Sequence, residues 1–553
     1  MGTRFTVILG FILVAYSFLL FHLYEVQFSQ GEYYQAKAAS QEFASSLLRV
    51  KRGVIYFTNK NNERIPVGIS KDFPVIYAVP KDVKDVKAVA LLLASKLDIP
   101  VEEIEKKLSK EKDPYELIGD RISSEVARSI DNLKMKGIYV TTEPRRFYPF
   151  GTRAAHLLGY VGPAPQGTGT EGHYGIEGLY NDYLAGISGA LENKKITQPV
   201  PGKDLTLTLD SNIQNEAERI LENLVAKHKA EGGDIIVEDP QTGKILAMAS
   251  RPGFDPNNYR EAKIGNFLNP TIQEIYEPGS IFKVITMAAG IDSGKIAPDT
   301  TYVDTGTLTL NGRTIENYDL KTKGPYGKVT MANVIEHSIN TGAVFAQRTI
   351  GRDIFKQYVE RFGFGEKTGI DLLGELKGNI RRLSSKEKDI AFATASYGQG
   401  VATTPLEVIN AIAALANGGK LMRPYVNAEL APQVIRTVVT KTTAGKVTDM
   451  MISAVDKAEI AKIKSYTIAG KTGTAYIPDF KKGGYTDDVI NTYVGFGPTK
   501  NSRFVILVKL DKPEGAPVAS LTVVPAFRDL AQFILNYYNI PPDRLDAEQG
   551  EPL

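Results

Sequence analysis

Hydrophobic and polar positions divide the chain into an uncharged N-terminal run, a mixed middle part and a C-terminal part with clear strand and helix periods. The run from Phe5 to Leu23 holds no charged residue and has the length of a bilayer-spanning helix. Arg4 precedes it and Glu25 follows it, which places Met1 in the cytoplasm and the rest outside. The alternative is a cleaved signal peptide, but the Ala-x-Ala match at 36–38 lies too far past the run. We therefore expect an uncleaved, single-pass anchor.

The middle part has mixed helix and strand signals. Apolar residues recur at helical spacing from Asp82 to Asp98, Pro100 opens a second helix, and Ser123 to Leu133 forms a third. A G-x-G-x-x-G match at 167–172 has prolines before it and no helix pattern after it, so we interpret it as a loop and not as a dinucleotide site. This part contains no run of candidate catalytic groups.

The pattern changes near residue 200, where we place a domain boundary. Leu205–Asp210 alternates as a strand, and 211–229 has the period of a long helix capped by Asp210 or Ser211. Two strands then follow at 233–239 and 244–249, joined by a Pro-Gln-Thr-Gly turn. The C-terminal part is therefore predicted to be a sheet with helices.

Composition narrows the classes of function. Hydrophobic residues make up 43% of the chain and charged residues 23%, which is typical of folded globular domains. The net charge of +3 is too small to suggest a nucleic-acid-binding protein. Cysteine is absent, so disulfides, thiolate metal sites and cysteine nucleophiles are excluded.

The first candidate for chemistry is a serine followed three residues later by a lysine, Ser280 and Lys283, before an apolar run that ends at Gly290. We expect a helix from Ser280 to Gly290, which brings both side chains to one face. The serine hydroxyl needs a nearby base to become a nucleophile, and a lysine can be that base only when it is neutral. A single S-x-x-K is common by chance, so its partners decide the matter.

Two further motifs follow in the same domain. Ser338-Ile339-Asn340 offers a hydroxyl and an amide that could relay a proton and orient a peptide, and Lys471-Thr472-Gly473-Thr474 ends a strand-like stretch. Gly473 would let a substrate backbone add to this strand. Lys471 is expected to be charged, to bind a substrate carboxylate and to help keep Lys283 neutral. The three motifs together are the signature of class A β-lactamases and penicillin-binding proteins.

With these motifs the chain resembles the class B penicillin-binding proteins, membrane-anchored D,D-transpeptidases that cross-link peptidoglycan. The segment Asn269–Ile272, leading into Tyr276, looks more like the cell-division (septal) branch than the elongation branch. The resemblance covers most of the chain and rests on the N-terminal run, Arg52-Gly53, Arg146–Pro149, Gly175–Gly178, Pro278-Gly279-Ser280, Ser396–Gly400, Thr404-Pro405 and Ala469–Thr474.

The resemblance implies an α+β fold in three parts. These are a cytoplasmic tip and single transmembrane helix (1–24), an elongated, non-catalytic α+β pedestal of the dimerisation type (25–200), and a penicillin-binding transpeptidase domain with an antiparallel sheet flanked by helices (201–553). It also implies roles for residues: Ser280 the acylated nucleophile, Lys283 the base, Ser338 and Asn340 the relay, Lys471 with Thr472, Gly473 and Thr474 the carboxylate-binding strand, and the N–H groups of Ser280 and Thr474 the oxyanion hole.

The partners that the resemblance implies are peptidoglycan stem peptides, lipid-linked precursors, β-lactams, a membrane-embedded glycosyltransferase and other division proteins. The protein would lie in the cytoplasmic (inner) membrane with its catalytic domain outside. Neither a cofactor, a metal nor a nucleic acid is expected.

Several alternatives stay open. A hydrolase, either a D,D-carboxypeptidase or a β-lactamase, would use the same motifs, although Ile339 replaces the aspartate of the β-lactamase pattern and no Glu-x-x-Leu-Asn follows Asn340. An elongation-type transpeptidase would differ only in where it works. A β-lactam sensor would need a cytoplasmic output domain, and a few residues precede the run. The last alternative is a catalytically silent scaffold.

Overall fold

The structure, a computed structural model, describes residues 10, 13–20, 24, 50–110, 116–165, 169–187, 190–192, 195–197, 199–479 and 481–544. The chain separates into two compact units, one of 1–53 with 182–203 and one of 54–181 with 204–553. None of the helices within the described residues is long and apolar enough to cross a membrane. Of the predicted anchor, 5–23, the structure describes residues 10 and 13–20.

The smaller unit holds few described elements. Helix α8 (Asn181–Ala185) leads into the hairpin of β7 (Ala190–Glu192) and β8 (Lys195–Thr197). Ile187 and Val200, which flank the hairpin in the sequence, also pair with each other. The backbone N–H of Gly53 donates to the carbonyl of Leu184 at 2.8 Å, which joins the two chain segments of this unit.

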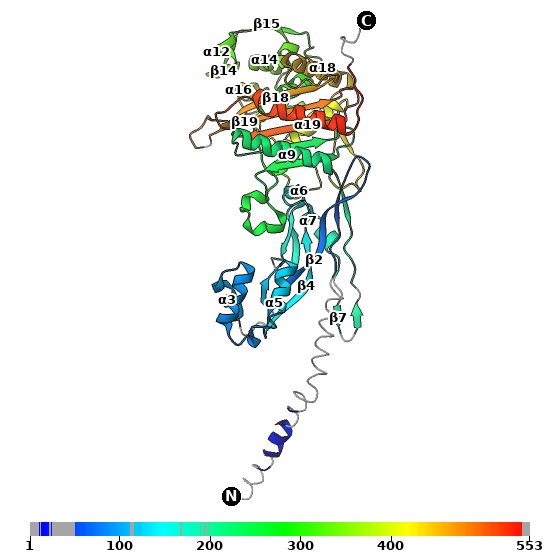
Figure 1. Cartoon of the computed structure of the whole chain (residues 1–553). Helices are drawn as coiled ribbons and strands as arrows, with labels where there is room; N and C mark the ends of the chain where they lie inside the picture. Colours follow the sequence, from blue (N-terminus) through cyan, green and yellow to red (C-terminus); the bar gives the residue numbers. More distant parts are fainter. Residues whose placement is uncertain are drawn as a thin grey trace, which may run out of the picture. The chain divides into compact units, whose positions relative to one another are not determined.

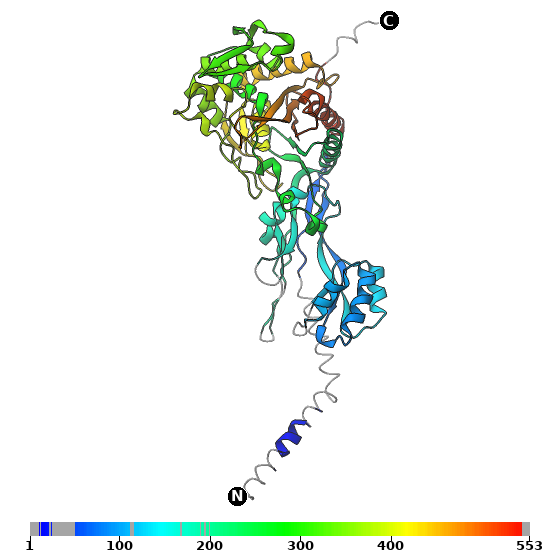
Figure 2. The same cartoon turned by 90° about the vertical axis from the view of Figure 1, so that its left-hand side faces the viewer.

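The larger unit begins with a five-stranded sheet. It has the order β3 (Glu116–Gly119), β2 (Ile65–Ala78), β1 (Ile55–Thr58) and β9 (Leu205–Asp210), and β4 (Ile138–Phe147) also pairs with β2. Helices α3 (Val86–Leu97), α4 (Val101–Leu108) and α5 (Ser124–Asp131) share one apolar core with the far end of β2. Figure 2 shows these blue helices grouped beside the long strands. The three helices predicted from periodicity are confirmed.

A buried ion pair joins two of the motifs that carry the resemblance. Arg146, on β4, donates its Nε to Glu177 Oε1 at 2.5 Å, and both side chains are almost fully buried. The Tyr148 hydroxyl donates to the same oxygen at 3.2 Å. Glu177 lies on α7 (Gly175–Leu179), which follows α6 (Ala155–Leu158) and the hairpin of β5 (Tyr160–Pro163) and β6 (Thr170–His173). Because β6 occupies the second half of 167–172, the loop predicted there is partly a strand; 166–168 lie outside the described residues.

A second five-stranded sheet organises the rest of the larger unit. All of its neighbouring strands are antiparallel, in the order β11 (Ile245–Arg251), β10 (Gly232–Glu238), β20 (Phe504–Asp511), β19 (Tyr485–Gly497) and β18 (Ala469–Pro478). The predicted 233–249 hairpin is confirmed, and β18, which carries Lys471, lies at the edge of the sheet.

Helices cover this sheet on both faces, as the resemblance implies. On one face α9 (Ser211–His228) and α19 (Val523–Tyr537) lie side by side and share an apolar core with the strands (Figure 1). Asp210, whose carboxylate accepts from the N–H groups of Asn212 and Ile213, is the cap of α9, which decides between the two predicted caps. On the other face α17 (Pro405–Ala416) contacts β10, β19 and β20.

The remaining elements form the helical part of this unit, which holds the site. They are α10 (Pro270–Gln273), α11 (Phe282–Asp292), β12 (Thr301–Asp304), β13 (Thr307–Leu310), β14 (Arg313–Glu316), α12 (Leu320–Lys323), β15 (Gly327–Thr330), α13 (Met331–Glu336), α14 (Asn340–Ile350), α15 (Arg352–Arg361), α16 (Asp389–Ala395), β16 (Lys420–Met422), β17 (Val434–Thr437) and α18 (Lys441–Ala458). The larger unit also has short 3₁₀ turns, one between β2 and α3 at Pro80–Asp82 and others at Pro256–Glu261, Ile264–Phe267, Gly279–Ile281, Arg381–Leu383 and Ala519–Leu521.

The helix predicted from Ser280 to Gly290 has different ends. Ser280 lies in the 3₁₀ turn Gly279–Ile281, and α11 begins at Phe282 and continues past Gly290 to Asp292. A Cβ at Gly290 would lie 2.5 Å from the Ile296 side chain. The prediction of a stop at Gly290 is therefore wrong, because this glycine makes room for a neighbouring chain segment instead of ending the helix.

Candidate active site

The serine and lysine of the first motif are in direct contact. Lys283 Nζ lies 3.0 Å from Ser280 Oγ, since the 3₁₀ turn and the first turn of α11 present both on one face. Gly279, just before the serine, has φ of 58°, a conformation that favours glycine. A Cβ there would also lie 3.2 Å from the carbonyl oxygen of Thr474, so the turn packs tightly against β18.

The second motif closes the site around the amine of Lys283. Lys283 Nζ donates to the carbonyl oxygen of Ser338 at 2.5 Å and to its hydroxyl at 3.2 Å. Ser338 can offer both oxygens because its backbone has φ of 57°, which turns its carbonyl toward the lysine side. Lys471 Nζ donates to the same hydroxyl at 3.1 Å. Ser280, Lys283, Ser338 and Lys471 thus form one continuous chain of polar contacts.

The two lysines have unusual protonation. Burial, and then the positive charge of Lys471, hold the pKa of Lys283 well below its usual value, and Asp319 opposes this effect. Burial alone lowers the pKa of Lys471 to about 7. The lowered pKa favours the neutral amine of Lys283, which is the form able to accept a proton from Ser280. Lys471 differs from the expectation of a fixed charge, because in the free protein it titrates near neutrality.

The third motif lies on the edge strand β18. Thr472 Oγ1 accepts from Lys471 Nζ at 3.2 Å, and Thr474 Oγ1 accepts from the backbone N–H of Ala519 at 3.3 Å. A Cβ at Gly473 would lie 2.7 Å from the carbonyl oxygen of Pro278. Gly473 is thus required because the segment before Ser280 passes close to β18. This reason differs from the predicted one, which is room for a substrate backbone.

Asn340 takes a different direction from the other predicted residues. Its Nδ2 donates to the carbonyl of Glu316 at 2.8 Å, and within the described residues no hydrogen bond joins its side chain to Ser280, Lys283, Ser338 or Lys471. The structure therefore brings together four of the five predicted catalytic residues, with Thr472 beside them. The fifth, Asn340, has its amide bound to the last residue of β14.

Two polar groups near the second motif have no counterpart in the sequence analysis. Asp304 accepts from Thr341 Oγ1 and Asn317 Nδ2 at 2.5 and 3.0 Å, which fixes the start of α14. Asp319 is the carboxylate that opposes the lowering of the Lys283 pKa. These residues are separated by irregular intervals, so no motif spacing could have identified them. The one signal in the sequence is that they lie shortly before the Ser338 motif, next to short strand patterns.

A groove of about 1140 Å³ adjoins the site. Its walls include Glu277, three residues before Ser280, and Tyr476 and Tyr485 from the hairpin of β18 and β19. Glu277 accepts from the N–H of Gly400 at 2.8 Å and from the Tyr485 hydroxyl at 3.0 Å. The groove is large enough for a peptide segment that runs along β18.

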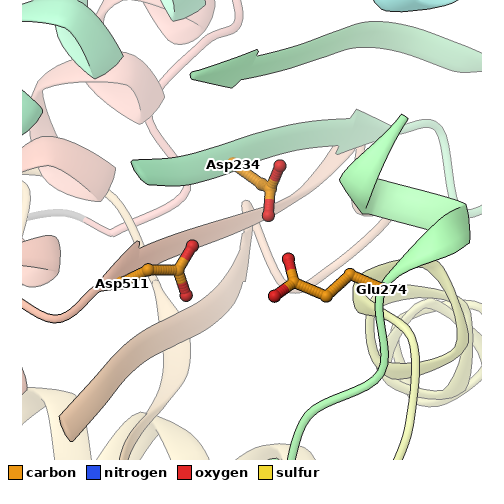
Figure 3. A group of neighbouring side chains, drawn as sticks. All are labelled: Asp234, Glu274 and Asp511. Atoms are coloured by element: carbon orange, nitrogen blue, oxygen red, sulfur yellow. The ribbon is translucent and has the colours of Figure 1, made fainter. Parts of the chain in front are cut away.

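A separate charged cluster lies beneath the segment that leads to Ser280. Asp234, Glu274 and Asp511 converge from β10, the end of α10 and the end of β20 (Figure 3). Their carboxylates are spaced closely enough to hold a metal ion. The fully buried Lys509 occupies this position instead, with its Nζ 3.2, 3.4 and 2.7 Å from Asp234, Glu274 and Asp511.

Comparison with known proteins agrees with this geometry. Residues 233–532 match the family model of the penicillin-binding protein transpeptidase domain, and 48–207 match that of the penicillin-binding protein dimerisation domain. Stage V sporulation protein D of Bacillus subtilis strain 168 is 31% identical, with 89% of this chain and 78% of the relative covered. Peptidoglycan D,D-transpeptidase FtsI of Escherichia coli K12 is 28% identical, with 98% and 93% covered.

A solved structure has the same fold. Penicillin Binding Protein 2X from Streptococcus thermophilus superposes with a TM-score of 0.72 over 89% of this chain and 80% of the other, at 22% identity.

Proposed function

The chain belongs to the class B penicillin-binding proteins and is a peptidoglycan D,D-transpeptidase, and on that premise we propose that Ser280 is its nucleophile. The observation that carries this proposal is the contact of Ser280 Oγ with the buried amine of Lys283 at 3.0 Å. A neutral amine at hydrogen-bond distance is the arrangement that general-base activation of a serine requires.

The proposed reaction proceeds in two acyl transfers. Lys283 takes the Ser280 proton, and Ser280 Oγ attacks the penultimate D-Ala carbonyl of one stem peptide. The backbone N–H groups of Ser280 and Thr474 hold the developing oxyanion. D-Ala leaves with a proton that Ser338 relays, and an amine of a second stem then takes the acyl group. Lys471, Thr472 and Thr474 hold the carboxylate of the leaving residue, and Gly473 keeps β18 close to Ser280.

Asn340 has a narrower proposed role than the sequence suggests. Its amide is bound to the Glu316 carbonyl, and we propose that it orients the donor peptide amide after a rotation toward Ser338. A labelled penicillin tests the whole assignment, because it should form an adduct on Ser280 that a peptide map locates. A label on another serine would contradict it.

We further propose that the protein is a single-pass protein of the cytoplasmic membrane with its catalytic domain outside, in three parts at 1–24, 25–200 and 201–553. The support is the uncharged run at 5–23 after Arg4. Protease added to intact spheroplasts should digest everything past about Glu25 and leave no large protected fragment. A mature N-terminus near Ala39 would instead show a cleaved signal.

For the cellular role we propose septal cross-linking, together with a membrane-embedded glycosyltransferase and other division proteins and fed by lipid-linked precursors. The support is the Asn269–Ile272 segment, which looks like the division branch. Depletion should give filamentous cells; round cells would indicate the elongation-type alternative. Added amine acceptors distinguish a transpeptidase from a carboxypeptidase, since the products are an amide and a free acid.

A further inference from the structure

A short segment after β14 is fixed against the second motif on the side away from β18. The carbonyl of Glu316 accepts from Asn340 Nδ2 at 2.8 Å, and Asn317 Oδ1 accepts from the N–H of Thr341 at 3.1 Å. Two hydrogen bonds therefore hold the chain next to the residues that follow Ser338. The next residues, Tyr318 and Asp319, form the rim of the site, and the Tyr318 side chain is 68% exposed.

The carboxylate of Asp319 is oriented by a second contact to the same motif. The Tyr326 hydroxyl donates to Asp319 Oδ2 at 2.5 Å, and the Tyr326 ring stacks on His337 with centroids 5.0 Å apart. His337 directly precedes Ser338. Asp319 is thus connected to both ends of the Ser338 motif, and 22% of its side chain remains exposed.

The negative charge of Asp319 is only weakly compensated by the cation beside it. Lys323 lies 3.6 Å from Asp319, but it is 62% exposed and its position one turn along α12 makes it a weak partner. On the inner side, the negative charge of Asp319 reaches the amine of Lys283. A cation that approached this rim would therefore find a carboxylate whose side chain is 22% exposed.

The second half-reaction needs such a cation. An acceptor amine is an ammonium ion in water near pH 7. At the reacting atoms it would meet Lys283 and Lys471, which offer no negative charge. By microscopic reversibility the acceptor nitrogen must also occupy the place that the leaving D-Ala nitrogen vacates, next to the Ser338 hydroxyl that relays its proton.

We propose that Asp319 is the docking group for the ammonium of the acceptor stem peptide, on the rim formed by Tyr318, Asp319 and Tyr326. This inference rests on the transpeptidase mechanism proposed above. Asp319 draws the ammonium to Ser338, where it releases one proton to solvent and becomes a neutral amine. As the nitrogen bonds to the acyl carbon it loses a second proton through the Ser338 hydroxyl to Lys283, the ester bond to Ser280 breaks, and Lys283 passes that proton to Ser280 Oγ. Asp319 is a positioning residue in this scheme.

The test uses the full-length protein in detergent with a D-alanyl thioester donor and D-alanine as acceptor. We expect Asp319→Asn to lower transfer to D-alanine by about 10-fold at low acceptor concentration, as for loss of a charged hydrogen bond. Transfer to hydroxylamine, which is uncharged near neutral pH, should not change. Acylation of Ser280 by penicillin should not become slower, because loss of the Asp319 charge lowers the pKa of Lys283 further, and retained acylation also shows that the variant folds.

Matched variants sharpen this test. Asp319→Glu should restore much of the transfer to D-alanine, and Asp353→Asn, an exposed carboxylate on α15, should have no effect. Equal losses with D-alanine and hydroxylamine, a parallel loss of penicillin acylation, or unchanged transfer to D-alanine would each overturn the docking role. A wild-type protein that is labelled on Ser280 but yields only free acid would instead contradict the transpeptidase mechanism itself.

Discussion

Lys283 and Lys509 are both completely buried in the larger unit, yet their surroundings shift their protonation in opposite directions. Within the part of the chain that the structure describes, the Lys283 amine hydrogen-bonds to oxygens of Ser280 and Ser338, and burial with the charge of Lys471 lowers its pKa. Lys509 contacts three carboxylates, and their charges raise its pKa above the usual value against the effect of burial.

The difference shows what makes a buried lysine reactive. Burial alone favours loss of the proton, as at Lys471, whose pKa falls to about 7. Carboxylates restore it, so that Lys509 acts as a fixed cation that holds β10, β20 and the Glu274 segment together. A lysine in an apolar setting with hydroxyl neighbours is a base, while a lysine among carboxylates is a structural ion. The variants below test this contrast through acylation by penicillin and, for Lys509, through unfolding.

The largest effect is expected for Ser280→Ala. Covalent labelling by penicillin should disappear, because no other hydroxyl in the contact chain is positioned on the nucleophile turn. Intact mass spectrometry measures the adduct, and an unchanged thermal unfolding curve is the control for folding. An adduct that persists in this variant would contradict the nucleophile assignment.

Lys283→Met comes next and isolates the base. Acylation should fall at least ~10²-fold, the lower end of a general-base contribution. The loss should be the same at every pH, because no titrating base remains beside Ser280. The second-order acylation rate, measured from pH 6 to pH 10, checks this. A rate that recovers at high pH would mean that another group serves as the base.

Lys471→Met should have a smaller effect that depends on pH. Loss of the neighbouring charge lets the pKa of Lys283 rise, so less of it is neutral at pH 7, and acylation should be about 10-fold slower there. Because burial is the larger cause of the Lys283 shift, the rate should partly recover as pH increases. The acylation rate of the wild type should instead fall as pH increases, because above pH 7 Lys471 loses the charge with which it binds the carboxylate. A uniform loss with the wild-type profile would limit Lys471 to carboxylate binding.

Lys509→Met should hardly change acylation by the folded protein but should weaken the fold. Removing the ammonium leaves Asp234 buried beside two other carboxylates, which costs about 3–5 kcal/mol of unfolding free energy. Urea unfolding measures this, with Lys512→Met as the control, since its ion pair with Glu231 is exposed and contributes little. Asp234→Val combined with Lys509→Met should recover much of the loss. Slow acylation by the folded variant would show that the cluster also positions Ser280.

Much of the site could be predicted from the sequence because its motifs are local. Ser280 and Lys283 are three residues apart, so helical geometry alone makes them neighbours, and the strand pattern of β18 fixes which residues accompany Lys471. Periodicity likewise gives α9, which buries one regular face, while two short apolar runs joined by a turn give the hairpin of β10 and β11, whose strands are buried on both faces.

The rest depends on contacts between distant segments. The passage of Gly290 against Ile296, the partner of Asn340 on β14, and the pairing of β9 with β1 in the first sheet are set by tertiary packing that no local period records. The sequence gives a weak signal for this cluster: Lys509 is a charged residue in the apolar strand Phe504–Leu510, and Asp234 is one at the start of β10. Neither strand by itself indicates that the two side chains meet.

The left-handed backbone at Ser338 has a consequence for the evolution of antibiotic resistance. One residue supplies both a carbonyl and a hydroxyl to Lys283, and it does so from a conformation that β-branched residues avoid. Threonine, which keeps the hydroxyl, is therefore disfavoured by the backbone, while glycine and asparagine, which suit the backbone, lack the hydroxyl. Almost no substitution of Ser338 that β-lactams could select keeps both the backbone conformation and the hydroxyl. Resistance substitutions should accumulate instead along the neighbouring groove, at side chains such as Tyr476 and Tyr485, where shape can change without loss of the chemistry.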